Sequence, residues 1–532
     1  MYDYEIEVED PNDPRKDPPK WSTCLINNAV FSEGITYIGK SALRYNHSVT
    51  SVSLPSTLEG IGQNAFSGTE ITSITIPESV TSIGLLAFSN TSLVEVVIPD
   101  GVTSLGSSAF AKCTSLKRIT IGAGVTEINQ GLFANTPKLE SVTLGPNVKS
   151  INRWLTSDCG LRSIDIPASV TWISPSAFSA RSADALAAVN VDPANARYRS
   201  IDGVLYDKEC TEIIRYLPAM EGTVFEVPEG VRYLSDNCFL FAGGLEGITL
   251  PEGLEYIGTE SFTHCTSLRE LVIPDSVSQI ARNGISTGGT MDLLRIGEGI
   301  REITVITVPS MASVRVFAVG TSVERMDTAA LQGNPVLEGV EVHPDNLHYA
   351  SACGVLYNAN MTQLLVAPRS ATGSLTLPES VTHIADNAFS YSKLDYVTLD
   401  GSIQVLGNGA FRGAAIKTMV IPDTVKIIGN GAFEGCSELT FVYFVARNPP
   451  SIGSEAFSTG DDLRIYSPMA KGFADPYSSD PSLISYYESD VFYSDTADMI
   501  IHGQVYMVAI VLSAALLLLV GERLISRRIS GN

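Results

Sequence analysis

Residues 71–122 decide the fold, and they read ITSITIPESVTSIGLLAFSNTSLVEVVIPDGVTSLGSSAFAKCTSLKRITIG. The stretch states one pattern twice. Ile76-Pro77 recurs as Ile98-Pro99, and Ala87-Phe88 recurs as Ala109-Phe110, each 22 residues later. A fixed period of about 20 to 50 residues is typical of solenoids and repeat arrays. The period therefore predicts the fold before any local structure is considered.

Each repeat contains two apolar segments. In the first, Val96 and Ile98 alternate with Glu95 and Val97, which is the period of a short strand with one buried face. Pro99 then ends the strand because proline has no N–H to donate. The second segment has the form V-T-x-I-G-x-x-A-F, in which the glycine suits a bend and the Phe is a large apolar plug. One repeat cannot bury its apolar face alone, so the repeats must stack.

The Phe of this pattern, here called the Phe position, recurs along most of the chain. Its occupants are spaced 22 to 24 residues apart, apart from two longer gaps. They are Leu43, Phe66, Phe88, Phe110, Phe133, Leu155 and Phe178, then Phe239, Phe262, Ile285, Val308 and Leu331, then Phe389, Phe411, Phe433 and Phe457. Ile285 to Leu331 keep the spacing without the aromatic ring, so we interpret them as degenerate repeats.

The two gaps contain related sequences, residues 189–217 and 340–368. Both carry V-x-V-x-P-x-N, a tyrosine, GVLY, a polar turn and a second apolar run. This order is typical of a β-hairpin. We interpret the pair as hairpin inserts, and inserts in repeat proteins often lie on the binding face. The alternative is a structural role, in which each insert only reinforces a coil.

The two ends of the chain differ from the repeats. Residues 1–22 are acidic and proline-rich, and they show no secretory signal. Residues 499–521 contain no Asp, Glu, Lys or Arg, a length and composition that predict a transmembrane helix. Arg523, Arg527 and Arg528 follow, so the tail 522–532 is expected in the cytoplasm and the preceding chain outside the cell.

An extracellular domain requires an export signal. Either the signal precedes Met1 and the sequence is a fragment, or the helix is a tail anchor of opposite orientation. We favour the fragment.

Composition narrows the partners and the chemistry. The net charge of −23 argues against nucleic acid and anionic membrane surfaces as partners. Cys113, Cys265 and Cys436 each follow the Phe position by three residues, which predicts small interior side chains rather than disulfides. The other cysteines show no zinc or redox spacing.

No catalytic motif occurs in the sequence. A weak candidate for a surface metal site, His343 and His348 around Asp345, lies in the second insert. We predict no catalytic residues, no cofactor and no metal ligand, although an unmarked pair of glycosidase carboxylates stays open.

The outward positions of the strands remain as the candidate binding face. They are mostly Ser and Thr, as on any solvated sheet. The candidate residues are Glu95, Arg118, Asp165, Glu270, Tyr396, Phe441 and Tyr443. The aromatic members lie near the C-terminal end of the repeats and suggest a hot spot; a capping role is the alternative.

The unit L-x-x-I-x-I-P-x-x-V-T-x-I-G-x-x-A-F-x-x-C resembles the BspA-like (Treponema pallidum class) leucine-rich repeat over residues 35–460. The GVLY inserts and the stretch Asp462–Pro468 resemble features of the same family, whereas a cell-wall sorting motif is absent. The resemblance implies a surface protein that adheres to host proteins, matrix or other cells. It implies no catalytic centre and names no ligand.

We therefore predict a leucine-rich-repeat solenoid of 22–23-residue coils with short parallel strands, turns or short helical turns, and one C-terminal transmembrane helix. The predicted function is adhesin-like binding of a protein or glycan at the cell membrane. The alternatives are an inert spacer or coat, and an unrecognised carbohydrate-active enzyme. The predicted segments are 1–22 (truncated N-terminal segment), 23–188 (repeats), 189–217 (insert), 218–339 (repeats), 340–368 (insert), 369–468 (repeats and cap), 469–498 (linker), 499–521 (membrane helix) and 522–532 (tail).

Overall fold

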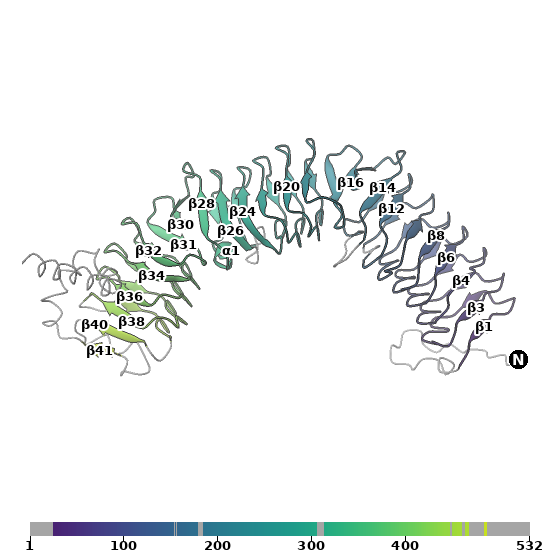
Figure 1. Ribbon diagram of the computed structural model, residues 1–532, viewed down its shortest axis with the longest axis horizontal. Coiled ribbons are helices and arrows are strands. Elements are labelled where there is room, and N and C mark those ends of the chain that lie inside the picture. Colours follow the sequence, from purple (N-terminus) through teal and green to yellow (C-terminus); the bar gives the residue numbers. More distant parts are fainter. Residues whose placement is uncertain are drawn as a thin grey trace, which may run out of the picture. The chain divides into compact units, whose positions relative to one another are not determined.

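The structure is a computed structural model that describes residues 25–153, 155, 157–178, 185–305, 313–446, 450–459, 463–467 and 484–486. The chain divides into two compact units. Figure 1 labels the strands of both units and colours them along the sequence. Unit 1 comprises Met1–Arg269 and Ser276–Gly289, and unit 2 comprises Glu270–Asp275 and Thr290–Asn532. Each unit is a stack of coils joined by parallel strands, so the predicted solenoid is confirmed.

The predicted strands form one side of each coil, here called the long-strand row. Their residues alternate between exposed and buried, as in β6 and β8, because one face packs into the core. In unit 1 the row contains β1 (Asn28–Val30), β3 (Ser51–Ser53), β6 (Glu95–Ile98), β8 (Arg118–Ile121), β10 (Ser141–Thr143), β12 (Ser163–Ile166), β14 (Ala188–Val191), β18 (Val224–Glu226) and β20 (Gly247–Thr249). Residues 73–76 keep the alternation but form no strand.

A second row of two-residue strands, the short-strand row, lies in the V-T-x-I-G segment. Sequence reasoning expected only a bend there, because two residues are too few to show an alternation. In unit 1 this row contains β2 (Tyr37–Ile38), β4 (Gly60–Ile61), β5 (Ser82–Ile83), β7 (Ser104–Leu105), β9 (Glu127–Ile128), β11 (Ser150–Ile151), β13 (Trp172–Ile173), β19 (Tyr233–Leu234), β21 (Tyr256–Ile257) and β23 (Gln279–Ile280).

Unit 2 repeats both rows. Its long-strand row contains β22 (Glu270–Val272), β24 (Thr290–Ile296), β26 (Ser313–Val319), β28 (Gly339–Val342), β32 (Gly373–Thr376), β34 (Leu394–Thr398), β36 (Thr418–Ile421), β38 (Phe441–Phe444), β40 (Arg464–Ser467) and β41 (Ile484–Tyr486). Its short-strand row contains β25 (Glu302–Ile303), β27 (Arg325–Met326), β33 (His383–Ile384), β35 (Val405–Leu406), β37 (Ile427–Ile428) and β39 (Ser451–Ile452).

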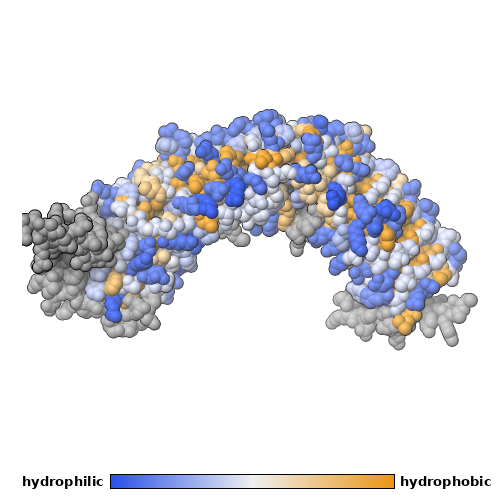
Figure 2. All heavy atoms as spheres, viewed as in Figure 1, coloured by the Kyte–Doolittle hydropathy of each residue, from blue (hydrophilic) through white to orange (hydrophobic). Residues whose placement is uncertain are grey.

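The Phe position fills the core of both units. Phe66, Phe88 and Phe110 are 0% exposed, and their rings stack with centroids 5.2 and 5.4 Å apart. Phe389 and Phe411 stack in the same way in unit 2, at 4.7 Å. The predicted interior plug is therefore confirmed wherever the position is described; Val308 lies outside the described residues. Figure 2 shows hydrophilic and hydrophobic residues interspersed over the visible face, because burial of a core leaves much apolar surface exposed in any folded protein.

The glycine of the I-G pair is required by close packing rather than by a bend. A Cβ on Gly84 would lie 2.7 Å from the carbonyl carbon of Gly62, and one on Gly106 would lie 2.3 Å from that of Gly84. Neither residue has a positive φ. The backbones of successive coils therefore approach one another at this point, and a side chain would separate them.

The coils around Ile285 and Leu331 replace the missing rings from another position. Phe317 on β26 is 0% exposed and points into the core, where other coils have a smaller residue. Leu331 lies in α1 (Ala329–Gln332), the one α-helix among the described residues. The degenerate repeats are thus genuine coils with a buried residue at the Phe position, and Phe317 adds an aromatic ring to the core from a strand.

Each insert forms three antiparallel strands. They are β15 (Tyr198–Ile201), β16 (Val204–Asp207) and β17 (Glu212–Arg215) in unit 1, and β29 (Tyr349–Ala352), β30 (Val355–Asn358) and β31 (Gln363–Val366) in unit 2. β16 and β17 are the hairpin that GVLY indicates, and β17 then pairs in parallel with β19. Each insert therefore continues the short-strand row of its unit.

No helix among the described residues is long and apolar enough to cross a bilayer. The predicted membrane helix 499–521, the tail 522–532 and the N-terminal segment 1–22 all lie outside the described residues. Of the predicted linker 469–498, only β41 is described.

Candidate binding face

The outward residues of the long-strand row form the candidate binding face. Strand pairing brings equivalent residues of successive coils side by side, so each outward residue has neighbours about 4.8 Å away along the row. A charged side chain on this face is therefore neutralised when the equivalent residue of the next coil carries the opposite charge.

Glu95 and Arg118, two predicted site residues, are paired with each other. They are register partners on β6 and β8, and Arg118 Nη2 lies 2.9 Å from Glu95 Oε2. The hydrogen bond from Arg118, together with its charge, lowers the pKa of the Glu95 carboxyl group. Because both side chains are about half exposed, the pair adds little to stability. It also presents no net charge to a partner.

Asp165 and Glu270 do not join that pair. Asp165 on β12 accepts a hydrogen bond from Asn190 Nδ2 at 2.9 Å, within unit 1. Glu270 is exposed on β22 in unit 2, where its register partner is Leu293. The predicted charged residues therefore form separate local contacts rather than one site.

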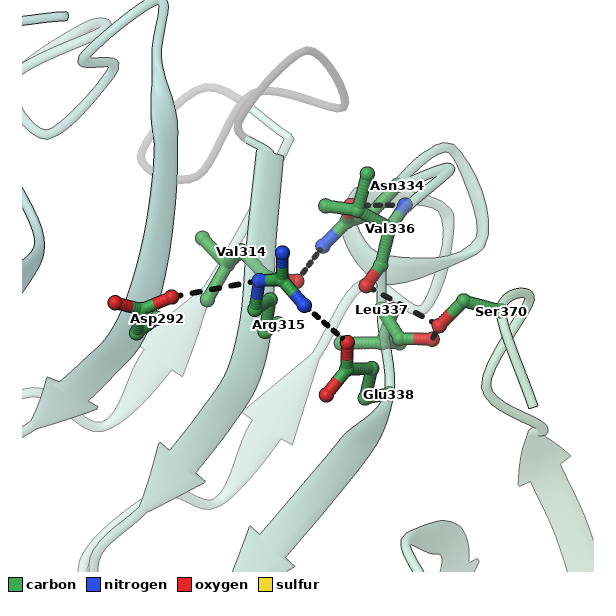
Figure 3. Close-up of polar contacts among 8 residues, drawn as sticks. All are labelled: Asp292, Val314, Arg315, Asn334, Val336, Leu337, Glu338 and Ser370. Carbon is green, nitrogen blue, oxygen red and sulfur yellow. Dashed lines mark hydrogen bonds and ion pairs between the residues drawn. The ribbon is translucent and has the colours of Figure 1, made fainter.

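A charged row that the sequence reasoning missed crosses unit 2 (Figure 3). Arg315 Nε lies 3.4 Å from Asp292 Oδ1, and Arg315 Nη1 lies 2.6 Å from Glu338 Oε1. The three residues are spaced 23 apart, so the period itself was the available signal. Arg315 lies between two carboxylates, which neutralise its positive charge. The row is therefore a set of exposed ion pairs, and Arg315 has no spare charge with which to bind an anionic partner.

Two of the three predicted aromatic residues, Phe441 and Tyr443, share a strand in unit 2, whereas Tyr396 lies on a neighbouring sheet. Phe441 and Tyr443 point outward from β38 with ring centroids 6.2 Å apart. The structure adds Tyr466 on β40, whose ring stacks on Tyr443 with centroids 5.0 Å apart and 11° between the planes. Tyr396 lies on β34, and Lys417 Nζ is 6.0 Å from its ring centroid. We call Tyr396, Phe441, Tyr443 and Tyr466 the aromatic patch.

Smaller side chains fill the spaces within the patch. Val420 is the register partner of Tyr443, and Thr418 is that of Phe441. Thr418 is only 9% exposed although it points outward, because large neighbours shield it. Burial raises the pKa of Tyr443, so its hydroxyl stays a neutral donor over the physiological range. Tyr466 could have been found from the sequence, since it follows Tyr443 by 23 residues.

Two basic residues lie beside the patch with different surroundings. Lys417 Nζ lies 2.5 Å from Asp395 Oδ1, and this contact lowers the pKa of Asp395. Arg464, the register partner of Phe441, is exposed. Among the described residues no hydrogen bond or ion pair involves its guanidinium. Within the described part of the chain, the patch thus has one cation paired with a carboxylate, Lys417, and one without such a partner, Arg464.

The cysteines and histidines that could carry chemistry have structural surroundings in the described part of the chain. Burial raises the pKa of the Cys265 and Cys436 thiols to about 12, and each donates a hydrogen bond to a main-chain oxygen of the preceding coil. His343 lies 3.9 Å from Asp345, but within the described residues no group of three or more His, Cys, Asp or Glu side chains gathers to hold a metal ion. These thiols are structural, as the sequence predicted.

Both inserts are attached to the preceding coil by a buried asparagine. Asn195 Nδ2 donates to the carbonyls of Pro167 and Val170, at 3.0 and 2.9 Å. Its Oδ1 accepts from the main-chain N–H groups of Arg197 and Tyr198. Asn346 makes the same four kinds of contact in the second insert. These contacts explain why both inserts carry the Asn of V-x-V-x-P-x-N. The sequence showed that the two inserts share this residue but not what it does.

The repeat geometry agrees with a comparison of protein families. The family described as "BspA type Leucine rich repeat region (6 copies)" matches residues 20–136, 59–184, 221–343 and 369–467. These ranges cover more than half of the chain. The chain belongs to this family. The BspA-type match stops before residues 499–521, and it leaves out the whole first insert and most of the second. A search of curated proteins found no match to this BspA-type chain.

Several solved structures are similar to this BspA-type chain. The pneumococcal vaccine antigen PcpA is 20% identical, with 71% of this chain and 88% of that chain covered and a TM-score of 0.43. A leucine rich cell surface protein from Faecalibacterium prausnitzii A2-165 is 25% identical, with 60% and 88% covered and a TM-score of 0.42. A leucine-rich repeat protein from Eubacterium ventriosum ATCC 27560 is 24% identical, with 65% and 84% covered and a TM-score of 0.35.

Proposed function

We propose that the chain is a membrane-anchored surface protein whose aromatic patch binds a protein or glycan partner in an adhesin-like manner. The observation that carries the proposal is the gathering of Phe441, Tyr443 and Tyr466 on one outward sheet face. Aromatic residues, and tyrosine in particular, dominate the energetics of binding surfaces. Two of the predicted charged residues, Glu95 and Arg118, already compensate each other.

The patch is suited to binding because it is preformed. Its rings rest on strands whose inward residues, such as Val442 and Ile465, are buried in the core of unit 2. The rings also support each other through stacking. Little side-chain entropy is therefore lost when a partner binds, so more of the contact energy contributes to affinity.

Residues 499–521 supply the proposed anchor, with residues 522–532 in the cytoplasm and the repeats outside the cell. The support is the uncharged apolar sequence and the arginines that follow it. Deleting residues 505–520 should move the protein from the membrane fraction to the soluble fraction. Retention in membranes after alkaline carbonate washing would contradict the anchor.

The binding proposal is tested with the full chain reconstituted in fluorescent liposomes. The measurement is saturable attachment to intact cells and to immobilised matrix proteins, with competition by unlabelled protein. Tyr443→Leu/Tyr466→Leu should reduce attachment at least tenfold while keeping apolar bulk on the strands. Glu95→Ala/Arg118→Ala is the matched control on the same row of unit 1, and it should attach as the parent does.

Two results would reject the binding proposal. One is equal attachment of the tyrosine variant and the parent, which would remove the patch from the site. The other is retention that is never saturable or competed, which would favour the spacer or coat alternative. Circular dichroism on both variants checks that the repeats remain folded.

A further inference from the structure

Stacking between neighbouring rings covers part of the ring faces in the aromatic patch. This inference rests on the proposed function and narrows its partner. Tyr443 and Tyr466 are nearly coplanar and 5.0 Å apart, so the facing sides of the two rings cover each other. Phe441 lies within 6.2 Å of both rings. A sugar ring binds an aromatic residue by lying flat on an exposed ring face. The stacking of Tyr443 on Tyr466 leaves fewer ring faces exposed for such binding.

Edges and hydroxyls suit a polypeptide better. Ring edges carry the positive part of the aromatic quadrupole and attract carbonyl and carboxylate oxygens. Tyrosine hydroxyls donate hydrogen bonds to main-chain carbonyls, and apolar side chains pack beside the rings. Val420, between the rows of rings, adds a small apolar surface of the same kind. The chemistry on the patch is therefore that of a protein interface.

The charged residues near the patch indicate which charge a partner should carry. Arg118 and Lys417 lie on or next to the long-strand row and are each paired with a carboxylate. Arg464 is different, since it is exposed next to Phe441 and has no ion-pair partner within the described residues. An uncompensated guanidinium at the border of an apolar surface favours a carboxylate, which it can bind with two parallel hydrogen bonds.

We propose that the patch recognises an acidic segment of a partner protein. A carboxylate of the segment binds Arg464, apolar side chains of the segment pack on Phe441 and Val420, and its main-chain carbonyls accept hydrogen bonds from the tyrosine hydroxyls. The chain carries a net charge of −23, so its overall field opposes such a partner. Recognition therefore depends on short-range contacts at Arg464, and nonspecific attraction of acidic proteins is suppressed.

The test uses the full chain in nanodiscs and fluorescence polarisation with synthetic probes. The first probe is a fluorescein-labelled peptide of four Glu-Leu-Ser repeats, and the matched probe replaces Glu by Gln. A third probe is a labelled oligosaccharide of uronic acids, which carries carboxylates on sugar rings. We expect saturable binding of the Glu peptide, at least tenfold weaker binding of the Gln peptide, and weaker binding of the oligosaccharide.

The variant Arg464→Gln should weaken binding of the Glu peptide at least tenfold. Arg295→Gln is the matched control, because Arg295 is also exposed on the long-strand row of unit 2 and has no ion pair among the described residues. The control should bind as the parent does. Circular dichroism of each variant shows whether a loss comes from unfolding.

Three outcomes would overturn the inference. They are equal binding of the Gln peptide, preferential binding of the oligosaccharide, and an unchanged affinity in Arg464→Gln. Comparison with the liposome assay separates this inference from the proposed function. Suppose that Tyr443→Leu/Tyr466→Leu abolishes cell attachment and Arg464→Gln does not. The aromatic patch is then the binding surface, and the proposal that it recognises an acidic segment is rejected. If neither variant changes attachment, both proposals fail.

Discussion

The hydroxyl of Tyr198 accepts a hydrogen bond from the main-chain N–H of Ile173, at 3.0 Å. Ile173 lies on β13, the edge strand of a short-strand sheet that ends where the first insert begins. In unit 2, Tyr349 has the equivalent relationship with Met326 of β27, which is also an edge strand. Each insert thus begins a new sheet of the short-strand row, and its tyrosine accepts from a main-chain N–H on the edge strand of the sheet before it.

Replacing Tyr198 by Phe should lower the free energy of unfolding by about 1–2 kcal/mol, because the buried N–H of Ile173 loses its acceptor. Urea denaturation of the full chain followed by circular dichroism measures the change. Tyr206→Phe is the matched control, since Tyr206 is also buried and, within the described residues, burial and nearby charges but no hydrogen bond act on its hydroxyl. Equal effects of the two substitutions would show that the hydroxyl of Tyr198 has no special role.

Phe88→Ala should lower the free energy of unfolding by about 3–5 kcal/mol. Phe88 is fully buried between Phe66 and Phe110, so truncation leaves a cavity between three coils. Hydrogen exchange should rise first in these coils, because repeat proteins couple mainly to nearest neighbours. Val97→Ala, at a position that is 57% exposed, should change stability by less than about 0.5 kcal/mol. Similar unfolding curves for the two variants would contradict the stacked core.

Gly68→Ala should lower the free energy of unfolding by about 2 kcal/mol for two reasons. Gly68 has φ +75°, which costs a residue with a Cβ about 1–2 kcal/mol. The new Cβ would also lie 2.5 Å from Cδ1 of Tyr45, whose ring is packed against it from the preceding coil. Tyr45→Ala removes the steric contact between the new Cβ and the ring but leaves the cost of the positive φ unchanged. A double-mutant cycle should give a coupling of about 1 kcal/mol, and strict additivity would disprove the contact.

Glu298 should make the stability of unit 2 depend on acid pH. Partial burial alone would raise its pKa, but hydrogen bonds from Thr321 and Ser322 outweigh burial and lower the pKa to about 2. The pKa is thus lower in the folded state than the ordinary value of 4.5. The stabilisation is complete above about pH 5 and is lost as the pH falls toward about 2. After allowance for solvent screening it amounts to about 1–2 kcal/mol.

Thermal unfolding at pH 7 and pH 3 measures this effect. Glu298→Gln should lower the melting temperature at pH 7 and should narrow the difference between the two pH values. Glu341→Gln, at an exposed position on β28, is the control and should leave that difference unchanged. An unaltered pH dependence in Glu298→Gln would show that other carboxylates control acid unfolding.

The sequence alone determined the repeat, the long strands and the interior position of Phe88, Cys113 and their equivalents. These features follow from patterns of burial within one coil, and each coil states the pattern again. The hairpin after GVLY and the outward direction of Phe441 and Tyr443 were predictable for the same reason. A period of two along one strand places both rings on one face, whatever the rest of the chain does.

Only the tertiary structure decided which residues of different coils meet. It paired Glu95 with Arg118, added Tyr466 to the patch, and left Arg464 without an ion-pair partner in the described part of the chain. It also showed that Gly84 is needed for close packing, and that Phe317 fills coils without a ring. These relationships depend on the alignment of coils and on the space between them, and no pattern within a single coil contains either.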